Sequence, residues 1–124
     1  TALEWCMTGR IFDASEALEA GLVRSVHPQA ELMDAARALA TEIAENSSPI
    51  SVAMTRAMLW RLSALEYPML AHRIDSRSIY RLSRGADAQE GIASFLEKRP
   101  PEFTGKVSTD MPDFYPWWQE PEYK

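Results

Sequence analysis

Two groups of side chains in this sequence have a chemistry and a spacing that could serve a ligand. The first is Phe95 and Lys98, which lie three positions apart and would therefore share one face of a helix. There the ring could stack on an adenine while the ammonium meets a phosphate, a charge-assisted contact that contributes about 1.5–3 kcal/mol. From the residues alone, a core phenylalanine beside a lysine that suits the helix dipole is the favoured alternative.

The second group is a row of arginines, spaced so that they would line one side of a helix: Arg73, Arg77, Arg81 and Arg84. Like charges at this spacing oppose helix formation by about 0.2–0.5 kcal/mol per pair, so something should offset their repulsion. We expect carboxylates of a neighbouring helix or subunit to do so. The functional alternative is that part of the row faces a phosphate-bearing ligand.

The other common kinds of catalytic or metal site find no support in the sequence. His27 and His72 are far apart, and neither has a second ligand at metal-binding spacing. The five glycines are scattered singly, so there is no glycine-rich phosphate loop. Paired carboxylates such as Glu16 and Glu19 have ready structural roles on helix turns. We therefore expect no catalytic residue, no metal site and no bound cofactor in this chain.

The composition is that of an ordinary globular protein, with 124 residues, 46% of them hydrophobic, which is enough for about one domain. The formal net charge of -5 gives no overall attraction to nucleic acid or to an anionic membrane. No apolar stretch approaches the ~20 residues that a membrane helix needs. The single cysteine, Cys6, cannot form an internal disulfide, which suits the cytoplasm, and its apolar neighbours predict that it is buried.

An all-α fold is expected, because patterns with a 3.6-residue period recur and strand signals are nearly absent. We expect helices at residues 2–8, 14–20, about 30–46, 49–62, roughly 65–83 and about 87–99, with a brief extended piece at 22–26. Gly9 and Gly21 are expected to end the first two helices. Ser48 and Pro49 should cap and open the fourth.

Two D-x-x-E patterns, Asp13 with Glu16 and Asp87 with Glu90, predict capping boxes at helix starts. Three of the expected helices show one apolar face each. The first two of the faces given below should drive self-association if nothing in the chain covers them. The faces comprise Leu32, Ala36, Leu39 and Ile43; Tyr67, Leu70, Ile74 and Leu82; and Ile92, Phe95 and Leu96.

The last part of the sequence, residues 107–124, is rich in proline and aromatic residues and should contain no regular helix. Termini are often disordered. Leaving so many rings in water is unfavourable by ~25 cal/mol per Å², however. We therefore expect the tail to dock on another part of the protein or on a sister subunit. Its rings belong to Phe114, Tyr115, Trp117 and Trp118.

Two stretches resemble the enoyl-CoA hydratase/isomerase (crotonase) family. Residues 7–26 resemble that family's L-T-G-x-x-x-x-A-x-E-A-x-x-x-G-L-V-x-x-V segment, and residues 87–103 resemble its D-x-x-E-G-x-x-A-F-x-E-K-R-x-P-x-F ending. A helix pair of the expected length, broken at Pro49, lies between them. Arg56 stands where the family often has lysine, and Ser94 stands where it commonly has alanine.

The resemblance implies that residues 1–106 form the C-terminal helical (trimerisation) domain of a crotonase-fold enzyme. The family's N-terminal ββα spiral, which carries the oxyanion hole and the catalytic glutamates, would then lie upstream. The abrupt start at Thr1, without a methionine, agrees with that expectation.

The resemblance also implies a function. The parent would be an enoyl-CoA hydratase, a lyase of fatty acid metabolism that hydrates 2-trans-enoyl-CoA thioesters through an enolate. Phe95 and Lys98 match positions that contact the CoA nucleotide, and CoA would be part of the substrate rather than a separate cofactor. Self-association into trimers or hexamers would follow. Isomerase, hydrolase or dehalogenase chemistry, or a non-catalytic assembly module, are the alternatives, and the chain alone should be inactive.

Overall fold

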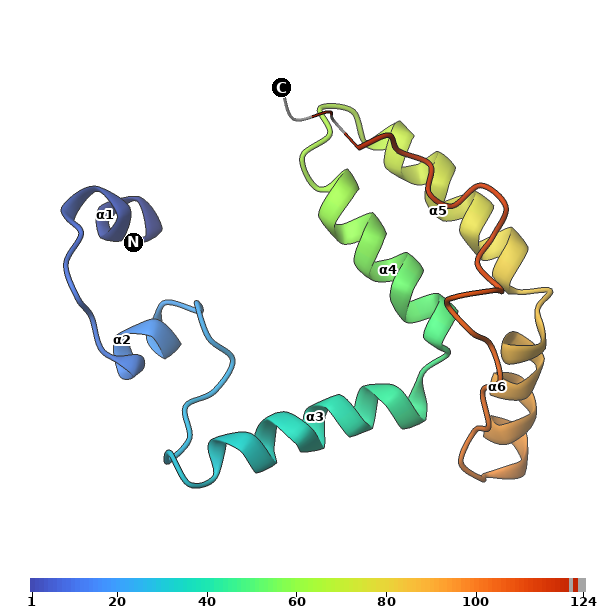
Figure 1. Ribbon diagram of the computed structural model, residues 1–124, viewed down its shortest axis with the longest axis horizontal. Coiled ribbons are helices and arrows are strands. Elements are labelled where there is room, and N and C mark those ends of the chain that lie inside the picture. Colours follow the sequence, from blue (N-terminus) through green and yellow to red (C-terminus); the bar gives the residue numbers. More distant parts are fainter. Residues whose placement is uncertain (121, 123–124) are drawn as a thin grey trace. The chain divides into compact units, whose positions relative to one another are not determined.

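The computed structural model describes residues 1–120 and 122, and this part of the chain contains only helices and connecting segments (Figure 1). The all-α prediction is therefore confirmed for the described residues. They form two compact units, Thr1–Thr41 and Glu42–Lys124, each of which is described by itself. The helices are α1 (Ala2–Thr8), α2 (Ala14–Glu19), α3 (Leu32–Asn46), α4 (Pro49–Leu62), α5 (Pro68–Leu82) and α6 (Ala86–Glu97).

The first unit is organised around Trp5, the only buried residue of α1. Its ring stacks on Phe12 with the ring centroids 4.0 Å apart, and its indole nitrogen donates to Glu16 at 2.8 Å. Arg10 also donates to Glu16. Hydrogen bonds, from Arg10 first and from Trp5 second, lower the pKa of Glu16 to about 2. Glu16 therefore ties the loop between α1 and α2 to both helices.

The predicted first capping box is half correct. Asp13 caps α2 by accepting a hydrogen bond from the backbone N–H of Glu16 at 2.8 Å. The side chain of Glu16 bonds Arg10 and Trp5 instead of completing the box. Gly9 and Gly21 adopt left-handed conformations with φ of 62° and 74°, as expected of residues that end helices.

The prediction that Cys6 is buried is wrong, because the thiol-bearing residue is exposed. The reason is the length of α1. Seven residues bury one position, Trp5, and the apolar neighbours on which the prediction rested, Leu3 and Met7, are 73% and 79% exposed. Where a brief extended piece was expected, residues 22–24 form bends and residues 25–26 have no regular structure.

In α3, the predicted apolar face is present in sequence but not covered. No residue of this helix is buried. The side chains of Leu32, Leu39 and Ile43 are 51%, 37% and 45% exposed. The face is therefore exposed within this chain, and its expected role in self-association stays a prediction.

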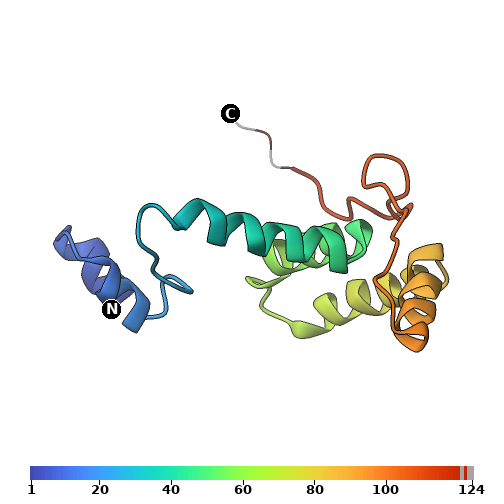
Figure 2. The same cartoon turned by 90° about the horizontal axis from the view of Figure 1, so that it is seen from below.

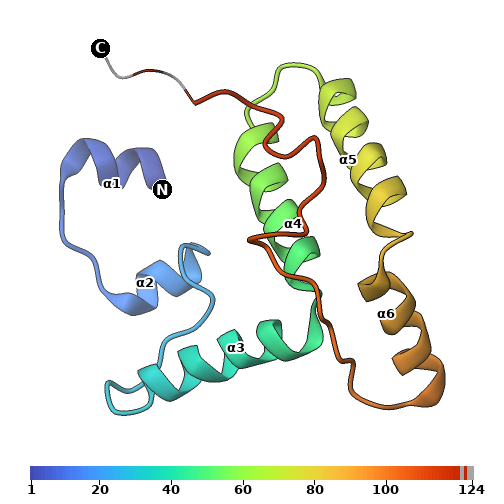
Figure 3. The same cartoon turned by 45° about the vertical axis from the view of Figure 1, so that its right-hand side comes forward.

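In the second unit, α4 and α5 pack side by side as a hairpin (Figures 1 and 3). Ser48 caps α4, with Pro49 in its first turn, as predicted. Buried residues recur every three or four positions along α4, which places Ile50, Met54 and Ala57 on one stripe. This stripe is the hydrophobic core of the unit.

The prediction for α5 is wrong at its start. The helix begins at Pro68, a residue well suited to a first turn, and not at 65. Tyr67 thus becomes the capping residue and is 62% exposed, while Leu70 is 47% exposed. The buried residue of α5 is Ser78, whose hydroxyl donates to the carbonyl of Ile74 at 2.7 Å.

The second predicted capping box does not form, because Gly85 is the N-cap of α6 and provides no side chain. Asp87 bonds a distant segment instead. Its carboxylate accepts from the Ser48 hydroxyl at 2.6 Å and from the backbone N–H groups of Thr104 and Gly105 at 3.0 and 3.1 Å. Asp87 thereby connects the starts of α4 and α6 to the loop after α6.

Gly105 approaches this junction so closely that a side chain would not fit. A Cβ atom there would lie 2.6 Å from an oxygen of Asp87 and 2.8 Å from the Ile50 Cδ1 atom. We expect Gly105→Ala to lower the free energy of unfolding by about 1–3 kcal/mol, the usual effect of overpacking. Urea unfolding followed by circular dichroism measures it.

Gly91→Ala in α6 is the matched control. Its Cβ would meet only Phe103 Cε1, at an ordinary 3.8 Å. Alanine in a helix is favoured over glycine by roughly 0.5–1 kcal/mol, so this variant should be neutral or more stable. Equal destabilisation by the two changes would refute the close approach at Gly105.

The tail docks on the helices of its own chain. After α6 it runs back over the α4–α5 pair (Figures 1–3). Phe114 is 9% exposed and joins Ile50 and Met54 in the core. The partly buried residues packed against this core are Leu82, Met111, Tyr115 and Trp117. Of the two interpretations of the tail, docking is the one that the structure supports, up to Glu120.

Candidate functional site

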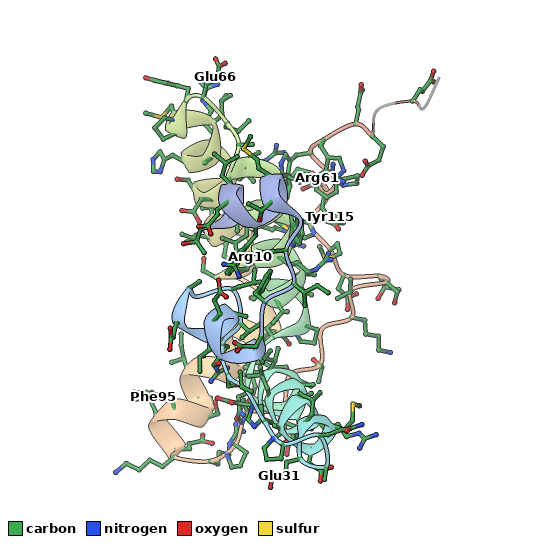
Figure 4. The ribbon with its side chains drawn as sticks, turned by 90° about the vertical axis from the view of Figure 1, so that its left-hand side faces the viewer. Arg10, Glu31, Arg61, Glu66, Phe95 and Tyr115 are labelled. Carbon is green, nitrogen blue, oxygen red and sulfur yellow. The ribbon has the colours of Figure 1, made fainter. Side chains whose placement is uncertain are left out.

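Phe95 and Lys98 lie at the C-terminal end of α6. Phe95 is 82% exposed and so does not belong to the core of this chain (Figure 4). Ile92 and Leu96 beside it are also exposed, at 63% and 72%. The predicted apolar face of α6 is therefore an exposed surface that includes an aromatic ring.

Lys98 lies just outside the helix and not in its last turn. It is the C-cap, with φ 54° and ψ 42° in the left-handed region. Its N–H bonds the Phe95 carbonyl at 3.4 Å, and the N–H of Arg99 bonds the Ser94 carbonyl at 3.1 Å, which together form a Schellman motif. The prediction that Phe95 and Lys98 share one face of a helix because they lie three positions apart does not apply, since Lys98 lies outside the helix and its position is set by this cap.

An ion-pair network surrounds the cap. Arg99 donates to the two carboxylate oxygens of Glu90 at 2.5 and 2.9 Å, and to Glu97 at 2.7 Å. The backbone N–H of Glu102 also donates to Glu90, at 2.7 Å. The Glu90 side chain is 20% exposed.

These bonds lower the pKa of Glu90 to about 2, with Arg99 the largest cause and Glu102 the next. Because the pKa is lowered by folding, the contribution of Glu90 to stability is present above the ordinary value of 4.5 and is lost as the pH falls toward 2. At neutral pH the carboxylate is ionised and the network is complete.

The predicted carboxylate partners of the arginine row are not found on a neighbouring helix of this chain. Among the described residues, no ion pair joins Arg73, Arg77, Arg81 or Arg84 to a carboxylate. The guanidinium of Arg77 instead lies over the Phe114 ring, 4.3 Å from its centroid, and that of Arg84 lies over Tyr80 at 4.4 Å. Within this chain, two of the four guanidinium groups thus make cation–π contacts with aromatic rings instead of ion pairs with carboxylates.

Arg81 lines a cavity of about 830 Å³ between α4, α5, the start of α6 and the loop after it. The cavity wall combines apolar side chains, hydroxyl groups and the charged side chains of Asp75, Asp87 and Asp110, and it does not include Phe95 or Lys98. The structure therefore does not bring the arginine row and the α6 end together at one pocket. Representative lining residues are Ile50, Met54, Thr55, Ser78, Leu82 and Phe103.

A further cation–π contact holds the tail near the end of α4. The guanidinium of Arg61 lies 4.6 Å from the Trp118 ring centroid and also bonds Glu120. Trp118 donates to Glu120 at 2.7 Å. Figure 4 shows Arg61 and Tyr115 at the same end of the unit. Sequence reasoning missed these contacts, although the excess of arginines and aromatic rings was visible.

In the part of the chain that the structure describes, no group of three or more His, Cys, Asp and Glu side chains is placed to hold a metal ion. The Ser25 hydroxyl and His27 are 2.7 Å apart on an exposed loop. Over the same residues, no helix has both the length and the apolar character needed to cross a membrane.

Comparison with known proteins gives a consistent result. A sequence profile described as enoyl-CoA hydratase/isomerase matches residues 1–106. An enoyl-CoA hydratase of Alternaria alternata is 36% identical over 103 residues, which cover 82% of this chain and 34% of the relative. Carnitinyl-CoA dehydratase of Proteus mirabilis is 38% identical over 107 residues, or 83% of this chain and 40% of the relative.

Solved structures agree with these sequence matches. Enoyl-CoA hydratase from Geobacillus kaustophilus superimposes with a TM-score of 0.70 at 35% identity, over 80% of this chain and 37% of that one. The chain thus spans between about a third and two fifths of the length of the relatives it matches.

Proposed function

The chain belongs to the enoyl-CoA hydratase/isomerase family, and we propose that it is the C-terminal helical part of an enzyme of that family. Two observations support a helical part of a longer enzyme. All regular secondary structure among the described residues is helical, and the match covers only about a third to two fifths of each relative. The C-terminal position itself rests on the resemblance of residues 87–103 to the family's ending. The enolate chemistry and the oxyanion hole would then belong to the remainder of the parent protein, and residues 1–124 would have no turnover of their own.

The encoded sequence on either side of this chain tests the position. A strand-rich ββα segment directly upstream of Thr1 is the expected finding. The same segment downstream of Lys124 would place these helices at the other end of the parent and overturn the proposal.

The parent enzyme would hydrate 2-enoyl-CoA thioesters in the cytoplasm. Elimination of water, the reverse reaction type, is the second candidate, because one relative is a carnitinyl-CoA dehydratase at 38% identity. Isomerisation and other reactions of the thioester enolate remain alternatives that only the rest of the parent can decide. In each case an acyl-CoA is the substrate, and CoA is not a separate cofactor.

Within this function, the proposed role of the chain is to supply part of the wall that binds the CoA nucleotide. The observation that carries it is the pairing, at the end of α6, of an aromatic ring that is 82% exposed with an exposed lysine held by the cap. Stacking of a base on such a ring is worth about 1–3 kcal/mol. A lysine–phosphate contact adds about 1.5–3 kcal/mol.

The experiment compares CoA binding by Lys98→Ala with that by the unchanged chain in a calorimetric titration. We expect the dissociation constant for CoA to rise about 10- to 100-fold, as loss of a charge-assisted contact predicts. Lys106→Ala is the matched control, since it removes an exposed lysine outside the α6 end and should leave the affinity unchanged. Equal effects of the two substitutions would show non-specific attraction instead of a site.

The helices are also proposed to mediate self-association, in trimers or hexamers of the parent. The support is the exposure of apolar side chains on α3 and α6, which water disfavours. Leu32, Leu39, Ile43, Ile92 and Leu96 are the residues concerned. Without the rest of the parent, this chain would act as a helical assembly module.

A further inference from the structure

We propose that Glu90 is the positioning residue of the CoA contact, acting through Arg99 to hold Lys98 in its binding conformation. This inference rests on the proposed function, because it takes Lys98 as the group that meets CoA. Glu90 itself would not touch the ligand. Its effect would be to tie the segment that follows Lys98, at Arg99 and Glu102, back to α6.

The geometry of the Glu90 carboxylate is the first argument. One oxygen accepts hydrogen bonds from Arg99 Nη1 at 2.5 Å and from the backbone N–H of Glu102 at 2.7 Å. The other accepts from Arg99 Nη2 at 2.9 Å. A single side chain on α6 thus holds Arg99, the residue that follows Lys98, and the backbone N–H of Glu102, three positions further along.

The conformation of Lys98 is the second argument. A left-handed backbone is disfavoured for any residue with a Cβ atom and persists where surrounding contacts over-determine it. Of the two hydrogen bonds of the cap itself, the one from Lys98 is long at 3.4 Å, and the one from Arg99 has an ordinary length of 3.1 Å. The bidentate pair of Arg99 with Glu90 is shorter and has a fixed orientation, so it is the stronger constraint on this turn.

The third argument concerns the charge of Lys98. No ion pair among the described residues involves its ammonium, whereas the adjacent arginine is held by two carboxylates. The two neighbouring cations therefore have separate roles. Arg99 is a structural group of the turn, and Lys98 presents its charge to solvent, where a phosphate can reach it.

Calorimetric titration with CoA of Glu90→Gln, Lys98→Ala and the double variant tests the role. We expect Glu90→Gln to raise the dissociation constant about 3- to 10-fold, the effect of having to immobilise a loosened side chain on binding. In the Lys98→Ala background the same change should have no further effect, because the group that it positions is absent. A merely structural role would weaken binding equally in both backgrounds.

Two additional variants sharpen the result. Arg99→Lys keeps the charge but loses the bidentate geometry, so it should raise the dissociation constant for CoA as much as Glu90→Gln does. If the Glu90→Gln variant folds poorly, Arg99→Lys takes its place in the test. Glu97→Gln is the matched control, because Glu97 bonds only the Nε of Arg99 and does not reach Glu102. It should change the affinity by less than about 2-fold if Glu90 is the main constraint.

The possible failures are distinct. If Lys98→Ala weakens CoA binding and neither Glu90→Gln nor Arg99→Lys does, the positioning role is overturned and the CoA contact stands. If Lys98→Ala leaves the affinity unchanged, the proposed CoA contact itself is overturned, and the positioning role with it.

Discussion

Phe114→Ala lowers the free energy of unfolding by about 3–5 kcal/mol, the range for removing a buried aromatic side chain. Phe114 is 9% exposed and packs with Ile50 and Met54 in the core of the second unit. The ring also lies under the guanidinium of Arg77, and loss of that cation–π contact adds about 0.5–1 kcal/mol. Denaturant unfolding followed by far-ultraviolet circular dichroism measures the change.

Phe95→Ala is the matched control for this substitution. The same atoms are removed from a ring that is 82% exposed, so the free energy of unfolding should change by no more than about 0.5 kcal/mol. In CoA binding the order should be reversed. Phe95→Ala should weaken the affinity for CoA more than Phe114→Ala does, because only Phe95 has a proposed contact with CoA. Similar stability losses at both positions would contradict the assignment of the tail to the core.

Met54→Ala is the other substitution with a large expected effect. Its side chain is fully buried, with 0% exposure, at the centre of the stripe on α4. We expect a loss of about 2–5 kcal/mol, because the surrounding helices close only partly over the cavity that is left. Denaturant unfolding followed by circular dichroism measures it, with tryptophan fluorescence as a second probe that reports the tail once Trp5 and Trp60 are replaced by phenylalanine.

Met54→Leu keeps the volume and should cost less than about 1.5 kcal/mol. Coincidence of the two probes would show that the tail and the α4–α5 pair unfold together. A tail transition that is unaffected by Met54→Ala would mean that the tail does not depend on this core.

Local signals in the sequence predicted local structure well. Ser48 followed by Pro49 fixed the start of α4, and Gly9 and Gly21 marked the ends of α1 and α2. These residues act through a cap or a left-handed backbone within a few positions of themselves, so no knowledge of the tertiary fold is needed. Pro68 is a local signal of the same kind, since proline suits the first turn of a helix. The predicted start of α5, at about residue 65, nevertheless lies three residues before the observed one.

Carboxylates with distant partners were not predictable in this way. The D-x-x-E pattern of Asp87 and Glu90 suggested a helix cap. Both groups instead bond backbone N–H groups of the loop after α6, at Glu102, Thr104 and Gly105. The helix N-terminus and the distant N–H groups compete for the same carboxylate oxygens. Which of them the oxygens accept from depends on the path of the loop after α6, and that path is a property of the tertiary fold.

Burial was the least predictable property, because it depends on what faces each helix. Tyr67, Leu70 and Cys6 have apolar neighbours in sequence, yet they are exposed. Phe95 and Lys98 show what could and could not be predicted. Its residue types were recognisable, but the exposure of Phe95 and the left-handed cap at Lys98 appear only in three dimensions.

The central claim is that the end of α6 contacts the CoA nucleotide, and a two-dimensional ¹H–¹⁵N spectrum of the labelled chain, recorded as CoA is added, tests it most directly. The prediction is that backbone signals of residues 94–99 shift in a saturable manner. Shifts confined to residues that line the cavity beside Arg81, or no saturable shift anywhere, would contradict the claim.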